Sequence, residues 1–278
     1  MTTKCEDINV LKTKAVAYRK KVLQIIHAAG SGHPGGSLSA VEIFIALYHY
    51  KMAHRPDNPR WEDRDRCIVS KGHCSPVTYV TLADCGYFPE SELLRFRKFG
   101  SPLQGHVHIR VPGVEFNTGS LGHGLSVANG IALGAKMLKK KIKTYCILGD
   151  GEIQEGSVWE AAMTAAHHKL DNLCAIVDYN KVQENGRTND IKNLEPLPAK
   201  WASFGWQVVE VDGHDFHDLL CALDQFDTVS DKPYVILAHT VKGKGVSFME
   251  GKSQWHGKAP KEDQLKAALA ELDGIKTN

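Results

Sequence analysis

Residues 144–152 read Thr-Tyr-Cys-Ile-Leu-Gly-Asp-Gly-Glu, a short apolar run that ends in a carboxylate between two glycines. This stretch decides the fold, because apolar runs of similar length recur at 172–177, 207–211 and 234–238. Helical patterns separate these runs, at 157–168, 197–204 and 216–226. Strands that alternate with helices predict right-handed crossovers. We therefore expect an α/β fold with a mostly parallel central sheet and helices on both faces.

The first half of the chain has a less regular pattern. Ser39, followed by Glu42 three residues later, is typical of a capping box, and we expect it to open a helix that runs through Tyr50. The other expected elements are helices at 7–29, 76–86 and 121–141, a strand at 66–70 and a long loop at 100–119. No segment has the composition of a linker, so we expect one domain over 1–278, with a short polar helix and tail at 261–278.

The composition excludes several classes of protein. The chain has 278 residues, with 34 Lys and Arg against 32 Asp and Glu, and a net charge of +2 argues against nucleic acid as the main partner. The 7 cysteines form no Cys-x-x-Cys pair, so we expect reduced thiols rather than disulfides. The N-terminus has no apolar core typical of a signal peptide, and the longest apolar stretch, 41–47, is too short to cross a bilayer. We therefore expect a cytoplasmic protein without a membrane partner.

Two of the expected strands end in possible metal ligands. Asp150 follows the strand at 144–148, and Asn180 follows the strand at 172–177. The carboxyl ends of parallel strands meet at one edge of a sheet, where ligands bind. A carboxylate, an amide oxygen and the backbone carbonyl of Val182 would form half of the shell of a hard cation such as Mg²⁺, with phosphate oxygens and water for the rest. The alternative is an ordinary turn beside an unrelated asparagine.

Two glycine-rich loops favour a phosphate group in the same site. Gly119-Ser-Leu-Gly-His-Gly124 and Gly30-Ser-Gly-His-Pro-Gly-Gly36 each precede a predicted helix, where free backbone N–H groups and the helix dipole attract an anion. Neither loop matches the P-loop or the dinucleotide-binding motif. The phosphate-bearing ligand is therefore of another kind.

Four histidines lie in loops among small residues, namely His33, His73, His106 and His256. An imidazole in such a place is accessible for proton transfer or for hydrogen bonds to a hydroxylated substrate. The four do not have the spacing of zinc-binding histidine pairs. We expect them to serve as catalytic residues.

Taken in order, these motifs resemble those of transketolases, from about Ala29 to Pro260. The blocks that carry the resemblance are Ser31-Gly-His-Pro-Gly-Gly36, Asp63-Arg-Asp-Arg66, Ser70-Lys-Gly-His73, Pro112-Gly-Val-Glu115, Thr118-Gly-Ser-Leu-Gly122, Gly149-Asp-Gly-Glu-Ile-Gln-Glu-Gly156 and Trp255-His-Gly-Lys-Ala-Pro260. The spacing of Asp150 and Asn180 also resembles the thiamine-diphosphate motif. Two blocks depart from the family, since Ser120 stands where a proline is common and Lys71 stands where an asparagine is frequent.

The resemblance implies a thiamine-diphosphate-binding fold and assigns roles to the candidate residues. Asp150, Asn180 and the Val182 carbonyl would hold Mg²⁺, or Ca²⁺ or Mn²⁺ in its place. Cofactor contacts would come from His73, Gly119, Ser120, Leu121, Gly151, Asn180 and His256. His33, His73, His106 and His256 would face the thiazolium ring and handle substrate hydroxyls and protons. Glu155 is similar to the acidic residue that the family places at the subunit contact near the active centre, and we count it among the cofactor-binding residues.

The resemblance also implies a missing part. Complete transketolases are more than twice as long and continue into a pyrimidine-binding domain and a C-terminal domain. This chain therefore resembles the N-terminal subunit of a split transketolase, whose partner is a separate C-terminal subunit. We expect a dimer of this subunit within a hetero-oligomer. The implied reaction is reversible transfer of a two-carbon ketol group from a ketose phosphate to an aldose phosphate, as in the pentose phosphate pathway.

Three alternatives remain open at this point. A related enzyme that works on a sulfo-sugar or a branched-sugar phosphate would have the same motifs. Another thiamine-diphosphate enzyme, such as 1-deoxyxylulose-5-phosphate synthase or a 2-oxoacid dehydrogenase component, would share the metal motif. The third alternative is a polypeptide that binds the cofactor without catalysing a reaction.

Overall fold

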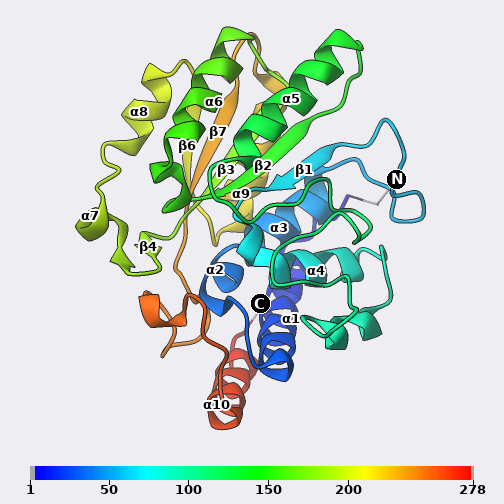
Figure 1. Ribbon diagram of the computed structural model, residues 1–278, viewed down its shortest axis with the longest axis vertical. Coiled ribbons are helices and arrows are strands. Elements are labelled where there is room, and N and C mark those ends of the chain that lie inside the picture. The colour runs from blue at the N-terminus through cyan, green and yellow to red at the C-terminus, as the bar shows by residue number, and fades with distance from the viewer. Residues whose placement is uncertain (1–3, 277–278) are drawn as a thin grey trace.

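Five parallel strands form the central sheet of this protein (Figure 1). The computed structural model describes residues 4–276. The strands lie in the order β1-β2-β3-β7-β6. Their bounds are β1 Arg66–Val69, β2 Thr144–Gly149, β3 Leu173–Tyr179, β6 Gln207–Asp212 and β7 Tyr234–His239. Each strand pairs in parallel with its neighbours, so the four expected apolar runs and the strand at 66–70 are confirmed.

The central strands β2 and β3 have no polar face because the sheet is covered on both sides there. In β2, Tyr145 and Ile147 belong to one core, whereas Cys146 and Leu148 belong to the other. Every residue of β3 is buried. Parallel sheets are typically buried in this way, and their strands therefore read as continuous apolar runs.

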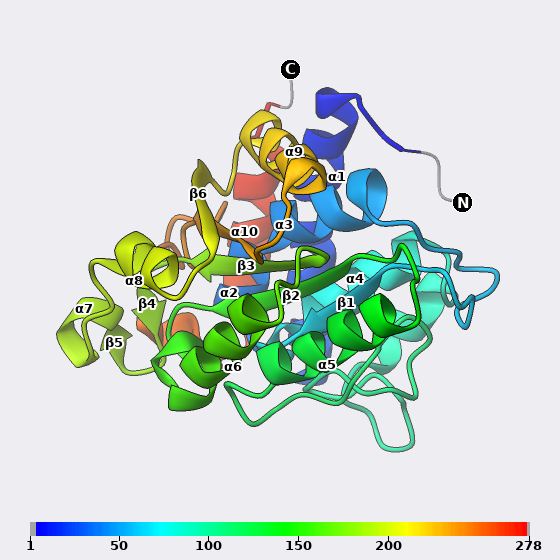
Figure 2. The same cartoon turned by 90° about the horizontal axis from the view of Figure 1, so that it is seen from above.

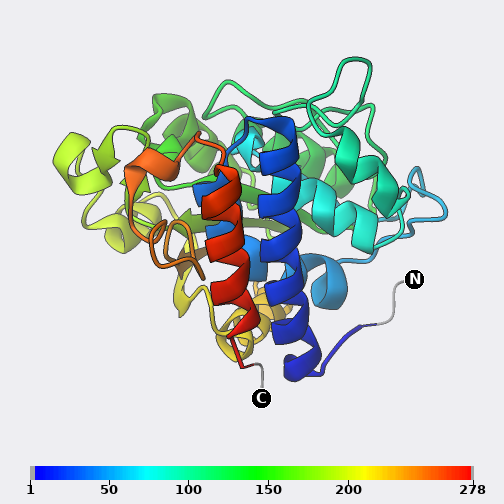
Figure 3. The same cartoon turned by 90° about the horizontal axis from the view of Figure 1, so that it is seen from below.

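Helices cover the two faces of the sheet (Figure 2). On one face lie α5 Gly124–Met137, α6 Gly156–His167 and α8 Leu197–Ser203. On the other lie α1 Ile8–Ala29, α3 Val41–Ala46, α4 Ser75–Asp84 and α9 Phe216–Gln225. The C-terminal helix α10 Glu262–Asp273 packs along α1 (Figure 3). The expected α/β class with helices on both faces is therefore confirmed.

Shorter elements complete the chain. They are α2 Pro34–Ser39, α7 Thr188–Ile191, the antiparallel hairpin of β4 Val182–Gln183 and β5 Gly186–Arg187, a π-helical turn Leu47–Lys51, and 3₁₀ turns at Gly72–Cys74, Glu90–Arg95, Glu152–Gln154, Phe226–Thr228 and Ser253–Trp255. Within 100–119 the structure has neither helix nor strand, as expected. Among the described residues, none of the helices is long and apolar enough to cross a membrane. All 7 cysteines are free.

The expected capping box at Ser39 is wrong. Ser39 is the last residue of α2, and its hydroxyl donates to the Gly36 carbonyl and to Asp178. The Glu42 carboxylate accepts two hydrogen bonds from Arg19 Nη2, each 2.7 Å long. Both side chains have charged partners far away in the sequence, and these stronger interactions replace the local ones that the capping box needs.

Candidate active site

A pocket of about 350 Å³ lies where the chain leaves the carboxyl ends of β1, β2, β3 and β7. Most of the predicted site residues line it: His33, His73, His106, Gly119, Leu121, Asp150, Gly151, Glu155, Asn180, Val182 and His256. Ser120 does not line the pocket, although both of its neighbours do. The structure therefore brings together every predicted site residue except this serine.

The four histidines form one cluster, with His33 at its centre. The ring centroid of His33 lies 5.2 Å from that of His73, 6.0 Å from that of His106 and 5.4 Å from that of His256. Burial, followed by the charges of neighbouring histidines, lysines and Arg97, lowers the pKa of His33 to about 4, and burial with neighbouring lysines and His33 lowers that of His256 to about 3. The cluster is therefore neutral at physiological pH and can donate and accept hydrogen bonds or take up a proton.

The three candidate metal ligands face the same pocket. Asp150 accepts hydrogen bonds from the backbone N–H groups of Gly151, at 2.8 Å, and of Lys181. The Asn180 side-chain oxygen accepts from the backbone of Val182 at 3.1 Å. Burial, followed by the nearby Asp178 carboxylate, raises the pKa of Asp150 to about 6. A buried carboxylate of this kind is stabilised by a cation.

A metal could not be held here by acidic, histidine and cysteine side chains alone. Among residues 4–276, no group of three such side chains is placed to hold a metal ion. The oxygen atoms of an amide and of a backbone carbonyl must therefore join Asp150. That mixed oxygen set suits a hard cation that takes its remaining ligands from a phosphate-bearing molecule.

Two buried lysines in the pocket were missed by sequence reasoning as site residues. Lys242 donates from Nζ to the Val182 carbonyl and to His256 Nδ1, both at 2.8 Å. Burial lowers the pKa of Lys242 to about 8. Lys71 pairs with Asp178 and donates to the Gly36 carbonyl at 3.1 Å. The available signal was position, since Lys242 follows the predicted strand at 234–238.

Glu152 connects the loops on the other side of the pocket. Its carboxylate accepts hydrogen bonds from the Ser70 hydroxyl and from the backbone N–H groups of Gly122, at 3.0 Å, and Gly149, at 3.1 Å. The N–H of Gly124 is bonded to Ser70 Oγ. The glycine-rich loop before α5 therefore does not offer these two N–H groups to an anion, contrary to the expectation from the sequence.

The hairpin of β4 and β5 forms a polar rim at the pocket mouth. Gln183, Glu184 and Asn185 line the pocket, and Gln183 accepts a hydrogen bond of 2.8 Å from Gln154. Sequence reasoning missed these residues as well. Glu155 also lies at the mouth and is exposed. The inner part of the pocket is thus formed by buried cations, carboxylates and neutral histidines, and the outer part by exposed polar groups.

The family model described as "Transketolase, thiamine diphosphate binding domain" matches residues 11–276. Among curated proteins, an apulose-4-phosphate transketolase subunit of Phocaeicola vulgatus is 43% identical over 266 residues, which cover 96% of this chain and 95% of that protein. The 6-deoxy-6-sulfo-D-fructose transketolase subunit SqwG of a Clostridium species is 45% identical over 264 residues, with coverage of 95% and 96%.

Complete transketolases match this chain over less than half of their length. Human transketolase is 37% identical over 268 residues, which are 96% of this chain but 42% of the human protein. The crystal structure of transketolase from Campylobacter jejuni superposes with a TM-score of 0.91 at 34% identity and covers 98% of this chain and 44% of that one. The fold described above is therefore the fold of a part, less than half, of these longer proteins.

Proposed function

This chain belongs to the transketolase family, and from that premise we propose that it is the cofactor-binding subunit of a two-chain transketolase. One observation carries the proposal. The pocket at the carboxyl edge of the sheet combines three oxygen donors with a cluster of neutral histidines. The near-complete mutual coverage with two proteins named as transketolase subunits supports a separately encoded partner.

The residues of the pocket fit thiamine diphosphate with a divalent metal. Asp150, the Asn180 side chain and the Val182 carbonyl would hold Mg²⁺, Ca²⁺ or Mn²⁺, because they are the hard oxygen donors that such cations prefer. His73, His256 and the Gly151 backbone would contact the diphosphate side. Gly119 and Leu121 would lie against the cofactor rings. When bound, thiamine diphosphate supplies the electron sink for cleavage of a carbon–carbon bond in a ketose.

The side chains of this subunit bind and orient the sugar and move its protons. His33, His106 and His256 are neutral donors and acceptors for substrate hydroxyls. A hydrogen bond from the Lys242 ammonium occupies Nδ1 of His256, so the ring proton of His256 lies on Nε2. The substrate side of the reaction is therefore hydroxyl recognition and proton transfer by imidazoles.

The proposed reaction is reversible transfer of a two-carbon ketol group between sugar phosphates. A substrate of the pentose phosphate type is one candidate. A branched-sugar phosphate or a sulfo-sugar is the second, and it is favoured by identities of 43% and 45% to the two named subunits against 37% to human transketolase. The two candidates differ in the acceptor and donor sugars and share the chemistry of the pocket.

The proposed partner is a C-terminal transketolase subunit with a pyrimidine-binding and a C-terminal domain. This chain spans 42% of human transketolase, so the remainder has to come from another polypeptide or another part of the same one. We further propose a dimer of this subunit within the assembly, with the exposed Glu155 near the contact. The free cysteines support a cytoplasmic location.

The test is reconstitution. The purified chain and its partner, found by co-purification or in the neighbouring reading frame, are assayed separately and together with ketose phosphate, apulose 4-phosphate and sulfofructose donors. We expect turnover only from the mixture and only with thiamine diphosphate and a divalent metal. Full activity from this chain alone would contradict the two-chain proposal, and the preferred donor decides between the two substrate candidates.

A further inference from the structure

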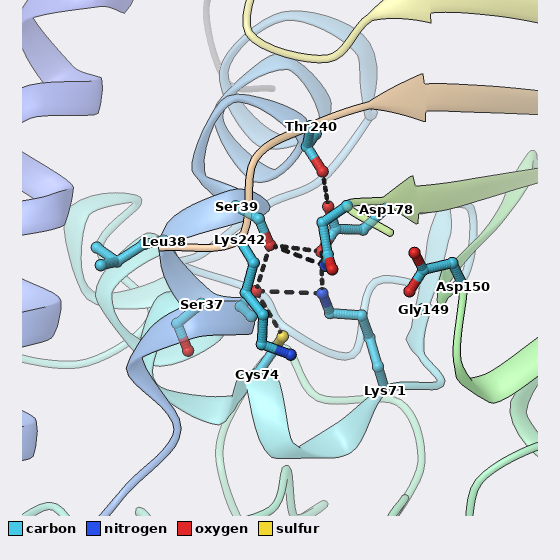
Figure 4. Close-up of polar contacts among 12 residues, drawn as sticks. Ser37, Leu38, Ser39, Lys71, Cys74, Gly149, Asp150, Asp178, Thr240 and Lys242 are labelled. Atoms are coloured by element: carbon cyan, nitrogen blue, oxygen red, sulfur yellow. Dashed lines mark hydrogen bonds and ion pairs between the residues drawn. The ribbon is translucent and has the colours of Figure 1, made fainter. Parts of the chain in front are cut away.

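Asp178 is a fully buried carboxylate next to the last residue of β3, and four side chains donate to it (Figure 4). Its Oδ2 accepts from Ser39 Oγ at 2.6 Å, from Asn180 Nδ2 at 3.1 Å and from the Lys71 ammonium. Its Oδ1 accepts from the Thr240 hydroxyl. The sequence pattern alone assigns no role to this residue, because it lies directly after the apolar run that predicts β3.

The four donors come from the segments that carry the site. Lys71 stands two residues before His73, after β1. Thr240 stands two residues before Lys242, after β7. Ser39 ends α2, whose N-cap is His33, and the fourth donor is Asn180 itself. A single carboxylate therefore links the segments that place the histidines, the buried lysine and a candidate metal ligand.

The bond to Asp178 is one of the contacts that fix which way the amide of Asn180 points; Asn180 Nδ2 also donates to Ser39 Oγ at 3.5 Å, and the Val182 N–H donates to the amide oxygen. An ionised carboxylate only accepts hydrogen bonds, so the amide group of Asn180 must turn its nitrogen toward Asp178. The amide oxygen is then left on the other side, where it also accepts from the Val182 backbone. If the amide were reversed, two oxygen atoms would face each other in a buried place. Asp178 supplies the charged acceptor for the amide nitrogen, and without it the orientation would rest on the weaker contacts to Val182 and Ser39.

Lys71 stabilises the ionised, buried carboxylate of Asp178 by forming an ion pair with it. The side chains of the pair are 2% and 0% exposed, and a carboxylate buried to this degree without a cation would be strongly unfavourable. Because Lys71 is committed to Asp178, it balances that charge and leaves Asp150 as the carboxylate available to a cation in the pocket.

We infer that Asp178 is a positioning residue that sets the metal-facing orientation of Asn180 through a hydrogen bond to its amide nitrogen. The inference rests on the proposed function, since it concerns the same metal position. Groups that do not touch a metal but orient its ligands typically alter metal affinity by about 10–100-fold. Asp178 acts in this way on Asn180, and Lys71 acts on Asp178.

The experiment measures Mn²⁺ binding in the presence of thiamine diphosphate, by electron paramagnetic resonance, on the full chain mixed with its partner. Asp178→Leu removes every acceptor and is expected to raise the Kd for Mn²⁺ at least about tenfold. The number of waters bound to Mn²⁺, from line broadening in ¹⁷O-enriched water, is expected to rise by one as the amide oxygen is lost. Asp178→Ala carries the same expectations and decides the matter if the leucine variant does not fold.

The Asp178→Asn variant should keep most of the affinity for Mn²⁺ that the leucine and alanine variants lose. Its amide can still turn an oxygen toward Asn180 and its NH₂ toward Thr240. The matched controls are Asp65→Leu and Asp65→Ala. Asp65 is a buried carboxylate at the opposite edge of the sheet, where it accepts backbone N–H groups of Ala53 and Lys143, both at 2.8 Å. These controls should lower the melting temperature and leave the Kd for Mn²⁺ within about twofold.

A folded Asp178→Leu or Asp178→Ala variant with unchanged Mn²⁺ affinity and water number would overturn the inference, while the metal site itself would stand. If the unsubstituted complex bound no Mn²⁺ with thiamine diphosphate, the proposed function would fail instead. A higher Kd with an unchanged water number would also overturn the inference, because the weaker binding would then not come from loss of the Asn180 ligand.

Discussion

The two ends of the strands in the central sheet use the same kinds of charged residue in opposite ways. We call the end at which the strands begin the amino edge and the end at which they finish the carboxyl edge. At the amino edge, lysines pair with acids on the surface. Lys169 and Asp231 are 3.4 Å apart with side chains 65% and 72% exposed, and Lys140 reaches Glu62 and Asp63 at 3.0 and 3.2 Å. At the carboxyl edge, the pair of Lys71 with Asp178 is buried, as are Lys242 and Asp150.

The difference teaches where function constrains the fold. Exposed ion pairs contribute only about 0–1 kcal/mol each, because water screens them, so the exposed pairs at the amino edge can be replaced with little loss of stability. A buried pair has lost its water, and removal of one partner leaves a charge without compensation. Charges are therefore concentrated at the carboxyl edge at the expense of stability, which is expected where a charged ligand is to be bound.

The largest expected effect is on stability at the carboxyl edge. Lys71→Met leaves Asp178 buried without its cation and should lower the free energy of unfolding by about 3–5 kcal/mol. Lys169→Met, at the amino edge, removes an exposed pair and should change it by less than about 1 kcal/mol. Urea denaturation of the two variants measures both values. Equal losses would remove the distinction between the edges.

The next effect is on activity. Asp150→Ala removes the proposed carboxylate ligand of the metal and should reduce ketol transfer by the mixed subunits at least about a hundredfold, or about 2.7 kcal/mol. The fold should survive, because the substitution removes a group whose charge is disfavoured by burial. Circular dichroism checks the fold. Wild-type activity in this variant would show that the metal-site assignment is wrong.

A third prediction compares two glycines of α5. Gly124 begins the helix at the carboxyl edge, where a methyl group would overlap the side chain of Ser70, so Gly124→Ala should lower the free energy of unfolding by about 2 kcal/mol or more. Gly134 has no atom within 4 Å of an added Cβ. Gly134→Ala should raise the stability of the isolated chain by up to about 1 kcal/mol, since alanine favours the helix. Thermal denaturation compares the two, and a stabilising Gly124→Ala would contradict the close packing of this loop.

The smallest effect is a pH dependence of stability. The pKa values of His33 and His256 are lowered by burial to about 4 and about 3, whereas an unfolded histidine titrates near about 6.5. Between these values the unfolded chain binds more protons, so the free energy of unfolding should fall as the pH falls from about 6.5 to about 4. The slope of the free energy of unfolding against pH measures how many protons the chain takes up on unfolding. Replacing both residues with asparagine should reduce that number by up to about two.

Denaturation curves at several pH values measure that slope. The matched control replaces His167 and His168, which are exposed at the end of α6, with asparagine. The control should leave the slope unchanged because these rings are not buried. An equal change in both double variants would mean that the histidine cluster is not the cause.

The strands and the residues that follow them could be predicted because both are local patterns. Apolar runs of five or six residues predicted the strands, and the polar residues shortly after two of them predicted Asp150 and Asn180 at one edge. The loop histidines were recognised by their small neighbours. Each of these inferences needs only residues that are close together in the sequence.

The failures have the opposite character. Asp178 and Lys71 are 107 residues apart in the sequence, and no local pattern indicates that they pair. The sequence pattern predicts a helix cap at Ser39, but its partner Asp178 is 139 residues away. Ser120 is predicted to bind the cofactor because it belongs to the transketolase-like block 118–122, and in the structure it does not line the pocket. Side-chain direction and distant partners are not contained in a motif.

The sequence by itself determined the α/β class, because the period of the apolar runs is a property of the chain, and its ordered motifs were enough to show the resemblance to the transketolase family. Only the tertiary structure decided that Lys71 is bound to Asp178, that Lys242 contacts His256, and which N–H groups Glu152 occupies. The physical reason is burial. The energy of a charge depends on what surrounds it once water is excluded, and the surroundings of these charges are assembled from segments that only the fold brings together.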